Sequence, residues 1–263
     1  MKDKLAIITG GTSGIGKEFA NQLAEKGYNI LITGRRIKEL EKVAEEIRNK
    51  TKVNVETYII DLAIDNEVEE FMIYLEKKNN IEFLVNNAGH GAEKSFTDDK
   101  YENQLEMINL HIIATVKLCH GLIKIMKKNK KGYIVNVSSV AAFNTFPSSA
   151  MYCSTKAFLI NFSQSLAMEV KKYHIKVQGL CPGFTRTHFH SRLKMDENIL
   201  KNKGLIRWMT TNKVVNISLN NIEKDLKVIV IPGISNKFIY HLNKFIPKSI
   251  YYKFAIKGWE LME

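Results

Sequence analysis

The sequence has few cysteines, and they are not grouped. Its 263 residues include three, Cys119, Cys153 and Cys181, an odd number at wide spacing. Disulfide-stapled domains and zinc sites need paired or closely spaced cysteines, so both classes are excluded. His188 and His190 have no third ligand beside them, and we predict no metal site there. We expect three reduced thiols in a cytoplasmic protein.

The sequence also lacks a long apolar run and a targeting segment. We expect no stretch that reaches the roughly 20 apolar residues of a membrane-spanning helix. The chain starts Met-Lys-Asp-Lys and passes into a strand-like run without the apolar core of a signal peptide. Internal repeats, linkers and low-complexity segments are missing as well. We therefore expect one domain over residues 1–263 and a protein that is not secreted.

The composition is that of a globular protein with excess positive charge. Hydrophobic residues make up 45% and charged residues 25%, and the net charge is +12. This charge admits nucleic acid, anionic membranes or phosphorylated ligands as partners. A lysine-rich solvated surface is the simplest explanation, but it does not explain where the charge lies along the chain. Most of the excess lies late in the chain, because Lys201–Glu263 holds eleven lysines or arginines against four acidic residues. Charge alone does not choose among these partners.

A glycine-rich segment follows the first apolar run of the chain. Residues 4–9 are strand-like, and a helical pattern with Phe19 and Leu23 begins directly after the glycines. Glycines let the backbone approach a pyrophosphate, and a helix start offers unpaired N–H groups to its negative charge. The segment is therefore a candidate dinucleotide-binding turn, although a plain strand-to-helix turn has the same pattern. Its candidate cofactor-binding residues are Gly10, Thr12, Ser13, Gly14, Ile15 and Gly16.

Two arginines follow the second apolar run, residues 29–33. The sequence there is Gly34-Arg35-Arg36, and no acidic residue stands where an NAD-binding protein holds the ribose hydroxyl. Arginine at this place suits a 2′-phosphate, so the pattern favours NADP(H) as cofactor. Arg35 is the stronger candidate because it is nearer the strand. The alternative is that both side chains only cap the solvated face of the helix that we expect over residues 37–50.

Polar residues also follow the third and fourth expected strands, residues 53–60 and 83–85. Asp61 and Leu62 close the third strand, where the carboxylate can accept a hydrogen bond from an adenine edge. The fourth strand is followed by a turn whose side-chain amides suit backbone or ribose contacts. His90 next to it lacks a nearby carboxylate or cysteine in the sequence, and we treat it as incidental. The candidate residues of this turn are Asn87, Ala88 and Gly89.

Tyr152 and Lys156 are the candidates for acid/base chemistry. They stand at the start of an expected helix that runs to about Tyr173, and their spacing puts both on one helix face. An ordinary phenol has a pKa of about 10, and a nearby ammonium favours the phenolate. Ser139 follows the expected strand 133–137, so its hydroxyl emerges where α/β sheets bind ligands and can hold a carbonyl oxygen. Taken alone, a tyrosine and a lysine at this spacing are common on ordinary helices.

The remaining elements complete an alternation of strands and helices. A helix is expected over residues 98–128, where Asn109 lies between apolar neighbours and by itself fits a satisfied core amide. Strands are expected at residues 175–180 and 227–231. Residues 184–209 lose strand character and are predicted to form a mobile apolar lid over a substrate pocket. The alternation predicts an α/β fold, a doubly wound parallel Rossmann sheet of about seven strands with helices on both faces.

Taken in order, these motifs resemble the short-chain dehydrogenase/reductase family over roughly Lys4–Gly233. The resemblance implies that Tyr152 is the general acid/base and that Ser139 positions the substrate carbonyl. Lys156 would bind the nicotinamide ribose and lower the phenol pKa, and Asn109 would hold a water in the proton relay. The turn glycines would lie along the pyrophosphate. Thr187 would contact the nicotinamide carboxamide, and the preceding candidate cofactor-binding residues are Pro182, Gly183 and Thr185.

The same resemblance implies an NADP(H)-dependent oxidoreductase that reduces a hydrophobic carbonyl compound or oxidises the matching alcohol. It also implies a homo-oligomer with a small-molecule substrate and no nucleic-acid partner. The long basic, apolar C-terminus resembles the branch with long-chain 3-oxoacyl thioester and hydroxysteroid reductases. A non-catalytic dinucleotide-sensing protein is the alternative, although a sensor needs the glycine turn and not the proton relay.

The C-terminal extension, residues 236–263, combines lysines with apolar side chains. Residues 236–258 hold five lysines and no acidic residue, and apolar side chains recur at helical spacing on both sides of Pro247. The pattern fits packing against the domain or a partner subunit, a wall of an acyl-chain pocket, or an interfacial membrane helix. We hypothesise salt-sensitive contact with an anionic membrane, which would place a cytoplasmic protein peripherally at the inner membrane surface.

Overall fold

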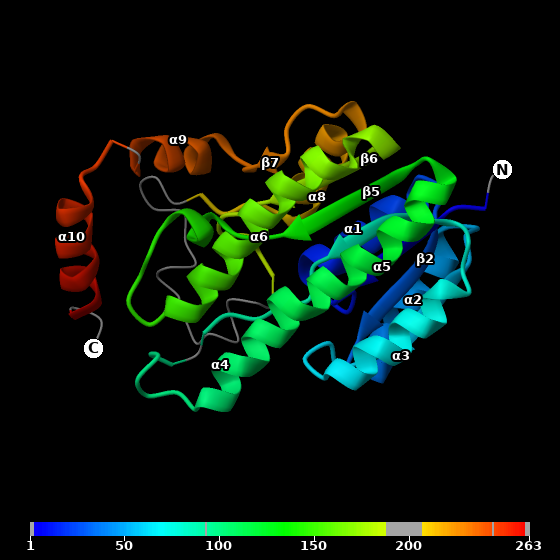
Figure 1. The fold of residues 1–263 in the computed structure, drawn as a ribbon, viewed down its shortest axis with the longest axis horizontal. Coiled ribbons are helices and arrows are strands. Elements are labelled where there is room, and N and C mark those ends of the chain that lie inside the picture. The colour runs from blue at the N-terminus through cyan, green and yellow to red at the C-terminus, as the bar shows by residue number, and fades with distance from the viewer. Residues whose placement is uncertain (1–2, 93, 188–206, 244, 261–263) are drawn as a thin grey trace.

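Parallel strands form one sheet in the computed structural model (Figure 1). The model describes residues 3–92, 94–187, 207–243 and 245–260. In this part of the chain the strand order is β3-β2-β1-β4-β5-β6-β7, all neighbours parallel, and it reverses between β1 and β4, where open α/β sheets bind ligands. The predicted doubly wound sheet is confirmed. The strands are β1 Leu5–Thr9, β2 Asn29–Gly34, β3 Val55–Ile59, β4 Ile81–Asn86, β5 Gly132–Val137, β6 Ile175–Leu180 and β7 Ile229–Val230.

Helices cover both faces of the sheet. In β1, Ala6 and Ile8 pack with one helix layer, whereas Leu5 and Ile7 pack with the other. Because both faces are buried, the strand is a continuous apolar run instead of an alternating one. One layer consists of α1 (Gly14–Glu25), α2 (Ile37–Lys50) and α8 (Thr211–Lys224). The other consists of α3 (Asp65–Glu76), α5 (Ala114–Asn129) and α6 (Ala150–Val170), with α5 and α6 crossing in front of the strands in Figure 1.

Several predicted elements differ from the observed ones, among them the strand expected over residues 83–85, which is extended at both ends as β4. The single helix expected over residues 98–128 is divided into α4 (Tyr101–Ile108), a π-helical turn η1 (Asn109–Ile113) and α5. The strand expected over residues 53–60 is shorter at both ends. The last strand, expected over residues 227–231, has two residues, because β7 pairs with β6 over that length and Pro232 follows soon after without a backbone N–H to donate.

The expectation that no apolar segment reaches membrane-span length is wrong for residues 101–129. By length and composition alone, Tyr101–Asn129 could cross a membrane. Its apolar side chains instead include Leu118, Leu122 and Met126, which are buried in the core against β4 and β5. The central helix of an α/β domain reaches the same composition because one side of it lies on the sheet.

Two helices follow β7, and they differ in how they are held. In α9 (Ile234–Asn243), Asn236 is buried and donates to the Pro232 carbonyl at 2.7 Å. The Tyr240 ring in α9 lies 4.4 Å from that of Phe143, centroid to centroid. In contrast, α10 (Lys248–Glu260) lies apart from the sheet at the edge of the molecule (Figure 1). Its Tyr251 hydroxyl donates to the Thr145 carbonyl at 2.8 Å.

Candidate active site and cofactor cleft

The glycine turn between β1 and α1 is packed so closely that side chains would not fit. Gly10 and Gly14 have φ of +67° and +58°, a region that favours glycine. A Cβ on Gly16 would lie 2.3 Å from the Gly10 carbonyl oxygen and 2.4 Å from Asn87 Nδ2. The glycines thus allow the close packing of the turn against the residues that follow β4.

The 86–89 turn is tied to this glycine turn by reciprocal hydrogen bonds. Asn87 Nδ2 donates to the carbonyl oxygens of Thr9 and Gly10 at 3.0 and 3.1 Å. In return, Thr9 Oγ1 accepts from the backbone N–H groups of Asn87 and Ala88 at 2.9 and 3.0 Å. The backbone contact suggested for the Asn87 amide is thus observed, and it holds the carboxyl end of β1 against the carboxyl end of β4.

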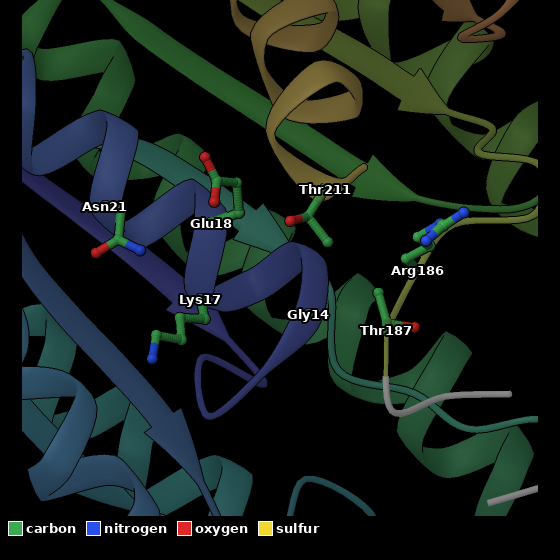
Figure 2. Close-up of a pocket in the computed structure, with 7 residues that line it drawn as sticks. All are labelled: Gly14, Lys17, Glu18, Asn21, Arg186, Thr187 and Thr211. Atoms are coloured by element: carbon green, nitrogen blue, oxygen red, sulfur yellow. The ribbon is translucent and has the colours of Figure 1, made fainter. Parts of the chain in front are cut away.

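The start of α1 opens onto a cavity of about 530 Å³ (Figure 2). The helix N-cap, Ser13, makes no side-chain capping bond, so the first N–H groups of α1 have no side-chain acceptor there. Thr187, which follows β6, stands across from the turn, because a Cβ on Gly14 would lie 3.0 Å from Thr187 Cγ2. Thr187 and Gly14 therefore line one cavity. Its other lining residues are Lys17, Glu18, Asn21, Arg186 and Thr211.

The two arginines after β2 have different surroundings. Arg36 Nη2 donates to Thr12 Oγ1 of the glycine turn at 2.8 Å, and Arg36 Nη1 lies 3.5 Å from Glu39 Oε1 of the following helix. Arg35 Nη1 instead lies 3.2 Å from Asp61 Oδ2 and 3.5 Å from Glu106 Oε1. Both acids come from elements that are distant in sequence. The sequence favours Arg35 for a phosphate, whereas the geometry places Arg36 against the turn and gives Arg35 two carboxylate partners.

Asp61 and Leu62 differ in accessibility beyond β3. The Asp61 carboxylate is half-buried and also accepts from the Ala63 backbone N–H at 3.0 Å. Leu62 is buried in the core under α3. Of this pair, the carboxylate is the part that faces outward and remains the candidate contact for an adenine.

Ser139, Tyr152 and Lys156 meet at the carboxyl end of β5. The Ser139 hydroxyl hydrogen-bonds the Tyr152 phenol and also accepts from the Ala141 N–H at 3.1 Å. Lys156 is one helical turn beyond Tyr152, its Nζ 5.9 Å from the phenol ring centroid. Lys156 Nζ is buried and donates to the Val137 carbonyl at 3.0 Å. The structure brings together the three side chains that the sequence analysis selected.

Burial dominates the pKa values of this cluster. It raises the pKa of Tyr152 to about 12, an effect that the hydrogen bond from Ser139 partly offsets. It lowers the pKa of Lys156 to about 8. Burial raises the phenol pKa, instead of the lowering that the resemblance implied for Lys156, whose ammonium donates to the Val137 carbonyl.

Asn109 lies at the π-helical turn of the long helix. The Ala114 N–H donates to the Asn109 carbonyl, five residues back, and the ladder of the helix shifts by one residue there. Such single turns occur frequently at functional sites. The sequence shows only a polar residue in an apolar helix, and no periodicity signals the extra residue.

His111, in the same turn, is not among the residues predicted from the sequence. Its side chain is 1% exposed and its ring lies edge-on to that of Tyr152, 6.2 Å between centroids. A Cβ on Gly89 would lie 2.6 Å from His111 Nε2 and 3.4 Å from Lys156 Nζ. The sequence signal that could have indicated His111 is a histidine two positions after Asn109 within an apolar helix. His90, treated as incidental, supplies its backbone N–H to this imidazole.

The segment after β6 is closed at its base. Thr185 forms a β-bridge with Met209. The Arg186 N–H donates to the Met209 carbonyl, and the Met209 N–H donates to the Phe184 carbonyl, both at 2.9 Å. We call residues 184–186 and 207–209 the neck. Gly183 leaves no room for a Cβ, which would lie 2.4 Å from Asn236 Oδ1. Pro182 accepts from the Val140 N–H at 3.0 Å and Thr185 Oγ1 donates to the Gly183 carbonyl at 2.9 Å.

Two predictions fall largely outside the described residues. The lid predicted over residues 184–209 lies there except for its two ends at the neck, and so do His188 and His190. Within the described ranges, no group of three or more histidine, cysteine or acidic side chains is arranged to hold a metal ion.

A doubly wound sheet with a glycine turn at its switch point and a Ser/Tyr/Lys cluster beside it defines a nucleotide-binding oxidoreductase. A family model described as short chain dehydrogenase matches residues 4–198. The chain belongs to the short-chain dehydrogenase/reductase family.

Within the family, the chain is similar to 3-oxoacyl reductases. It is 37% identical over 179 residues to a very-long-chain 3-oxoacyl-CoA reductase of Mycosarcoma maydis, covering 66% of this chain and 51% of that protein. The matched region is thus about half of that relative's length. It is 30% identical over 222 residues to a 3-oxoacyl-acyl-carrier-protein reductase of Aquifex aeolicus, covering 83% of this chain and 90% of that one. A short-chain dehydrogenase of Sphingobium yanoikuyae, solved with NADPH, superposes with a TM-score of 0.81 at 26% identity, covering 93% and 96% of the two chains.

Proposed function

We propose that the protein is an NADP(H)-dependent reductase of a hydrophobic carbonyl compound, with Tyr152 as its proton donor. The observation that carries the proposal is the Ser139, Tyr152 and Lys156 cluster at the carboxyl end of β5. Contacts link this cluster to the glycine turn: Lys156 lies against Gly89, and the neighbouring Asn87 binds Gly10. A carbonyl held by the cluster would therefore stand beside the dinucleotide cleft.

The cleft fits a nicotinamide dinucleotide on its own geometry. Gly14 lines the cavity at the start of α1, and this uncapped helix start offers N–H groups and a positive helix end to the charge of a pyrophosphate. Arg36 beside Thr12 supplies a cation where a 2′-phosphate would lie, which supports NADP(H) over NAD(H). When bound, the cofactor supplies the hydride.

The chain's own residues would handle the oxygen and the proton. The Ser139 hydroxyl would hold the carbonyl oxygen, and the Tyr152 hydroxyl would donate its proton to that oxygen as it becomes an alcohol. Burial favours the protonated phenol, which is the form that a reduction requires at the start. The Lys156 ammonium, one helical turn away, would attract the phenolate that remains until a proton is replaced, although burial is the larger influence on the phenol pKa. The reverse direction uses the same groups as acceptors.

The substrate class we favour is a 3-oxoacyl thioester or a similarly apolar ketone. Support comes from the likeness to 3-oxoacyl reductases acting on carrier-bound or very long acyl chains. The neck also brings together two aromatic rings, those of Phe184 and Trp208, which lie 5.1 Å apart between centroids. Consumption of NADPH, followed by its absorbance, with short and long 3-oxoacyl thioesters and cyclic ketones is the test. Activity confined to polar sugars or sugar acids would contradict the hydrophobic assignment.

The alternative is a dinucleotide sensor without turnover. The complete set of Ser139, Tyr152, Lys156 and Asn109 argues against it, because a sensor has no use for a buried proton donor. Tight NADPH binding without turnover of any substrate in the panel would favour the sensor.

We also propose that the protein is a cytoplasmic homo-oligomer that contacts an anionic membrane through its C-terminal helices. The support is compositional and structural. Lys253 and Lys257 in α10 are exposed, together with the apolar side chains of Ile250, Phe254 and Ile256. Apolar groups next to lysines suit the boundary between water and an anionic lipid surface.

A further inference from the structure

His111 occupies a buried position that joins two parts of the cleft. It belongs to η1, and the elements packed against it are the loop after β4 and the first turns of α6. The charged or titratable groups that face it are His90 from the loop and Lys156 and Tyr152 from α6. A buried histidine next to a lysine costs free energy if it gains a proton, so the neutral imidazole is the form that fits.

The hydrogen bonds at His111 fix which nitrogen carries the proton. The His90 backbone N–H can only donate, and it lies 3.2 Å from His111 Nε2, which must therefore accept. In a neutral imidazole Nδ1 then carries the hydrogen, and it lies 3.0 Å from Thr155 Oγ1. Thr155 Oγ1 in turn donates to the Tyr152 carbonyl at 3.0 Å. Every donor in this series meets an acceptor.

We propose that His111 is a positioning residue whose hydrogen bonds fasten the cofactor-cleft loop at His90 to the helical turn that carries Tyr152. The inference rests on the proposed function, because it assigns His111 the task of keeping the phenol in register with the cofactor. The imidazole reaches the reacting groups through Thr155 and the helix backbone. His111 is thus distinct from the residues that would touch the substrate.

The hydrogen bonds from His90 through His111 and Thr155 to Tyr152 require one donor and one acceptor on the imidazole, and a protonated histidine has two donors and no acceptor. With hydrogens on both nitrogens, Nε2 would face the His90 N–H, donor against donor. Burial together with the charge of Lys156 lowers the pKa of His111 well below its ordinary value. The fold thus holds this imidazole in the single tautomer that can bridge the two elements.

Three variants test the series by kinetics. His111→Phe keeps a ring of similar size but removes both hydrogen bonds, Thr155→Val removes the hydroxyl at nearly constant shape, and Thr155→Ser retains the hydroxyl. A misplacement of about 1 Å can cost on the order of 100-fold in rate, so we expect His111→Phe and Thr155→Val each to lower kcat by roughly tenfold to a hundredfold. Thr155→Ser should stay close to wild type.

A double variant separates positioning from simple loss of packing. Because both residues act in one series, His111→Phe combined with Thr155→Val should lower kcat little more than either change alone. A purely structural role predicts additive losses in thermal midpoint and an unchanged kcat for the folded fraction. His120→Phe on the exposed side of α5 is the matched control and should behave as wild type. Additive effects on kcat, or failure of Thr155→Ser to preserve it, would overturn the proposal.

Nitrogen-15 NMR of histidine-labelled protein tests the tautomer without any turnover. The resonance missing from the His111→Phe spectrum identifies His111. We expect Nδ1 protonated and Nε2 unprotonated at neutral pH, unchanged as the pH falls into the range where ordinary histidines titrate. A protonated Nε2, or titration like that of a free histidine, overturns the proposal even if the enzyme is active. If the tautomer is as expected and no substrate is turned over, the proposed function is at fault and the hydrogen-bonded series stands.

Discussion

Tyr152 is the residue whose hydroxyl the proposed chemistry cannot lose. In Tyr152→Phe the ring still packs edge-on to His111, while the transferable proton is gone. General acid/base groups contribute ~10²–10⁴-fold, and we expect a loss of kcat in that range with NADPH affinity retained. Stopped-flow reduction assays and fluorescence titration of NADPH measure the two quantities. Near-normal carbonyl reduction by the variant would contradict the mechanism.

Arg35 and Arg36 form a matched pair for testing cofactor choice. A charge-assisted hydrogen bond to a phosphate contributes about 1.5–3 kcal/mol, or roughly tenfold to a hundredfold in affinity. We expect the wild type to prefer NADPH over NADH and the double Arg35→Ala, Arg36→Ala variant to lose the preference. Titrations of the single variants then show whether Arg36, beside Thr12, or Arg35, beside two carboxylates, holds the phosphate. Equal wild-type affinities for the two cofactors would mean that the arginines serve only the surface.

Lys156 gives the free energy of unfolding a specific pH dependence. Its pKa is about 8 in the folded protein against 10.5 ordinarily, so between these values the unfolded chain binds more protons and stability rises with pH. Below about pH 8 the buried ammonium destabilises the fold. We expect Lys156→Met to be more stable than wild type at pH 7, and this advantage to shrink as the pH rises through 8 to 10.5.

Chemical denaturation of both proteins without cofactor, at several pH values, measures this difference. The raised pKa of Tyr152 makes the free energy of unfolding fall as the pH rises above about 10, which is the opposite of the effect of Lys156. Both proteins contain Tyr152, so its contribution cancels when their free energies of unfolding are subtracted. An advantage of Lys156→Met that is constant with pH would show that Lys156 keeps an ordinary pKa.

At the scale of elements, strand positions could be predicted and the inside of the long helix could not. Each strand buried on both faces is an apolar run, and the polar residues that follow it must lie at one edge of a parallel sheet. That logic places Ser139 and the glycine turn correctly from sequence alone. The π-helical turn at Asn109 leaves the apolar spacing almost unchanged, so nothing in the sequence reports it. The contacts of His111 depend on it.

Long-range partners were also beyond the sequence. Arg35 stands at the end of β2, whereas Asp61 follows β3 and Glu106 is in α4. Only the packing of these elements brings two carboxylates to the guanidinium. The absence of an acid next to Arg35 in the sequence was therefore no guide to the charges around it.

At the scale of the whole molecule, α10 is where contact with another surface should be sought. Asn236 and Tyr240 hold α9 to the body, so a truncation after Ser235 would disturb the fold, and removal from Pro247 onward is the better variant. Each lysine near an anionic surface adds about 1 kcal/mol, so we expect binding to phosphatidylserine vesicles at low salt that the truncation abolishes.

Co-sedimentation at low and high salt measures this binding. Lys253→Glu combined with Lys257→Glu is a companion variant that retains the helix and its apolar side chains. It should bind less than wild type. Intact protein that stays in the supernatant at low salt would eliminate the membrane contact, and a change of oligomer size on truncation would assign α10 to a partner subunit instead.

The neck suggests how this protein could be re-engineered. Two backbone hydrogen bonds between Phe184, Arg186 and Met209 close the chain on itself before and after the intervening residues. The entropy of closing such a loop grows only slowly with its length, by about 0.6 kcal/mol for each doubling. A replacement segment of another length or composition can therefore be grafted onto the neck at small cost to the sheet. We therefore expect changes in the number of residues between the two sides of the neck to leave the proton-transfer cluster and the stability of the sheet nearly unchanged.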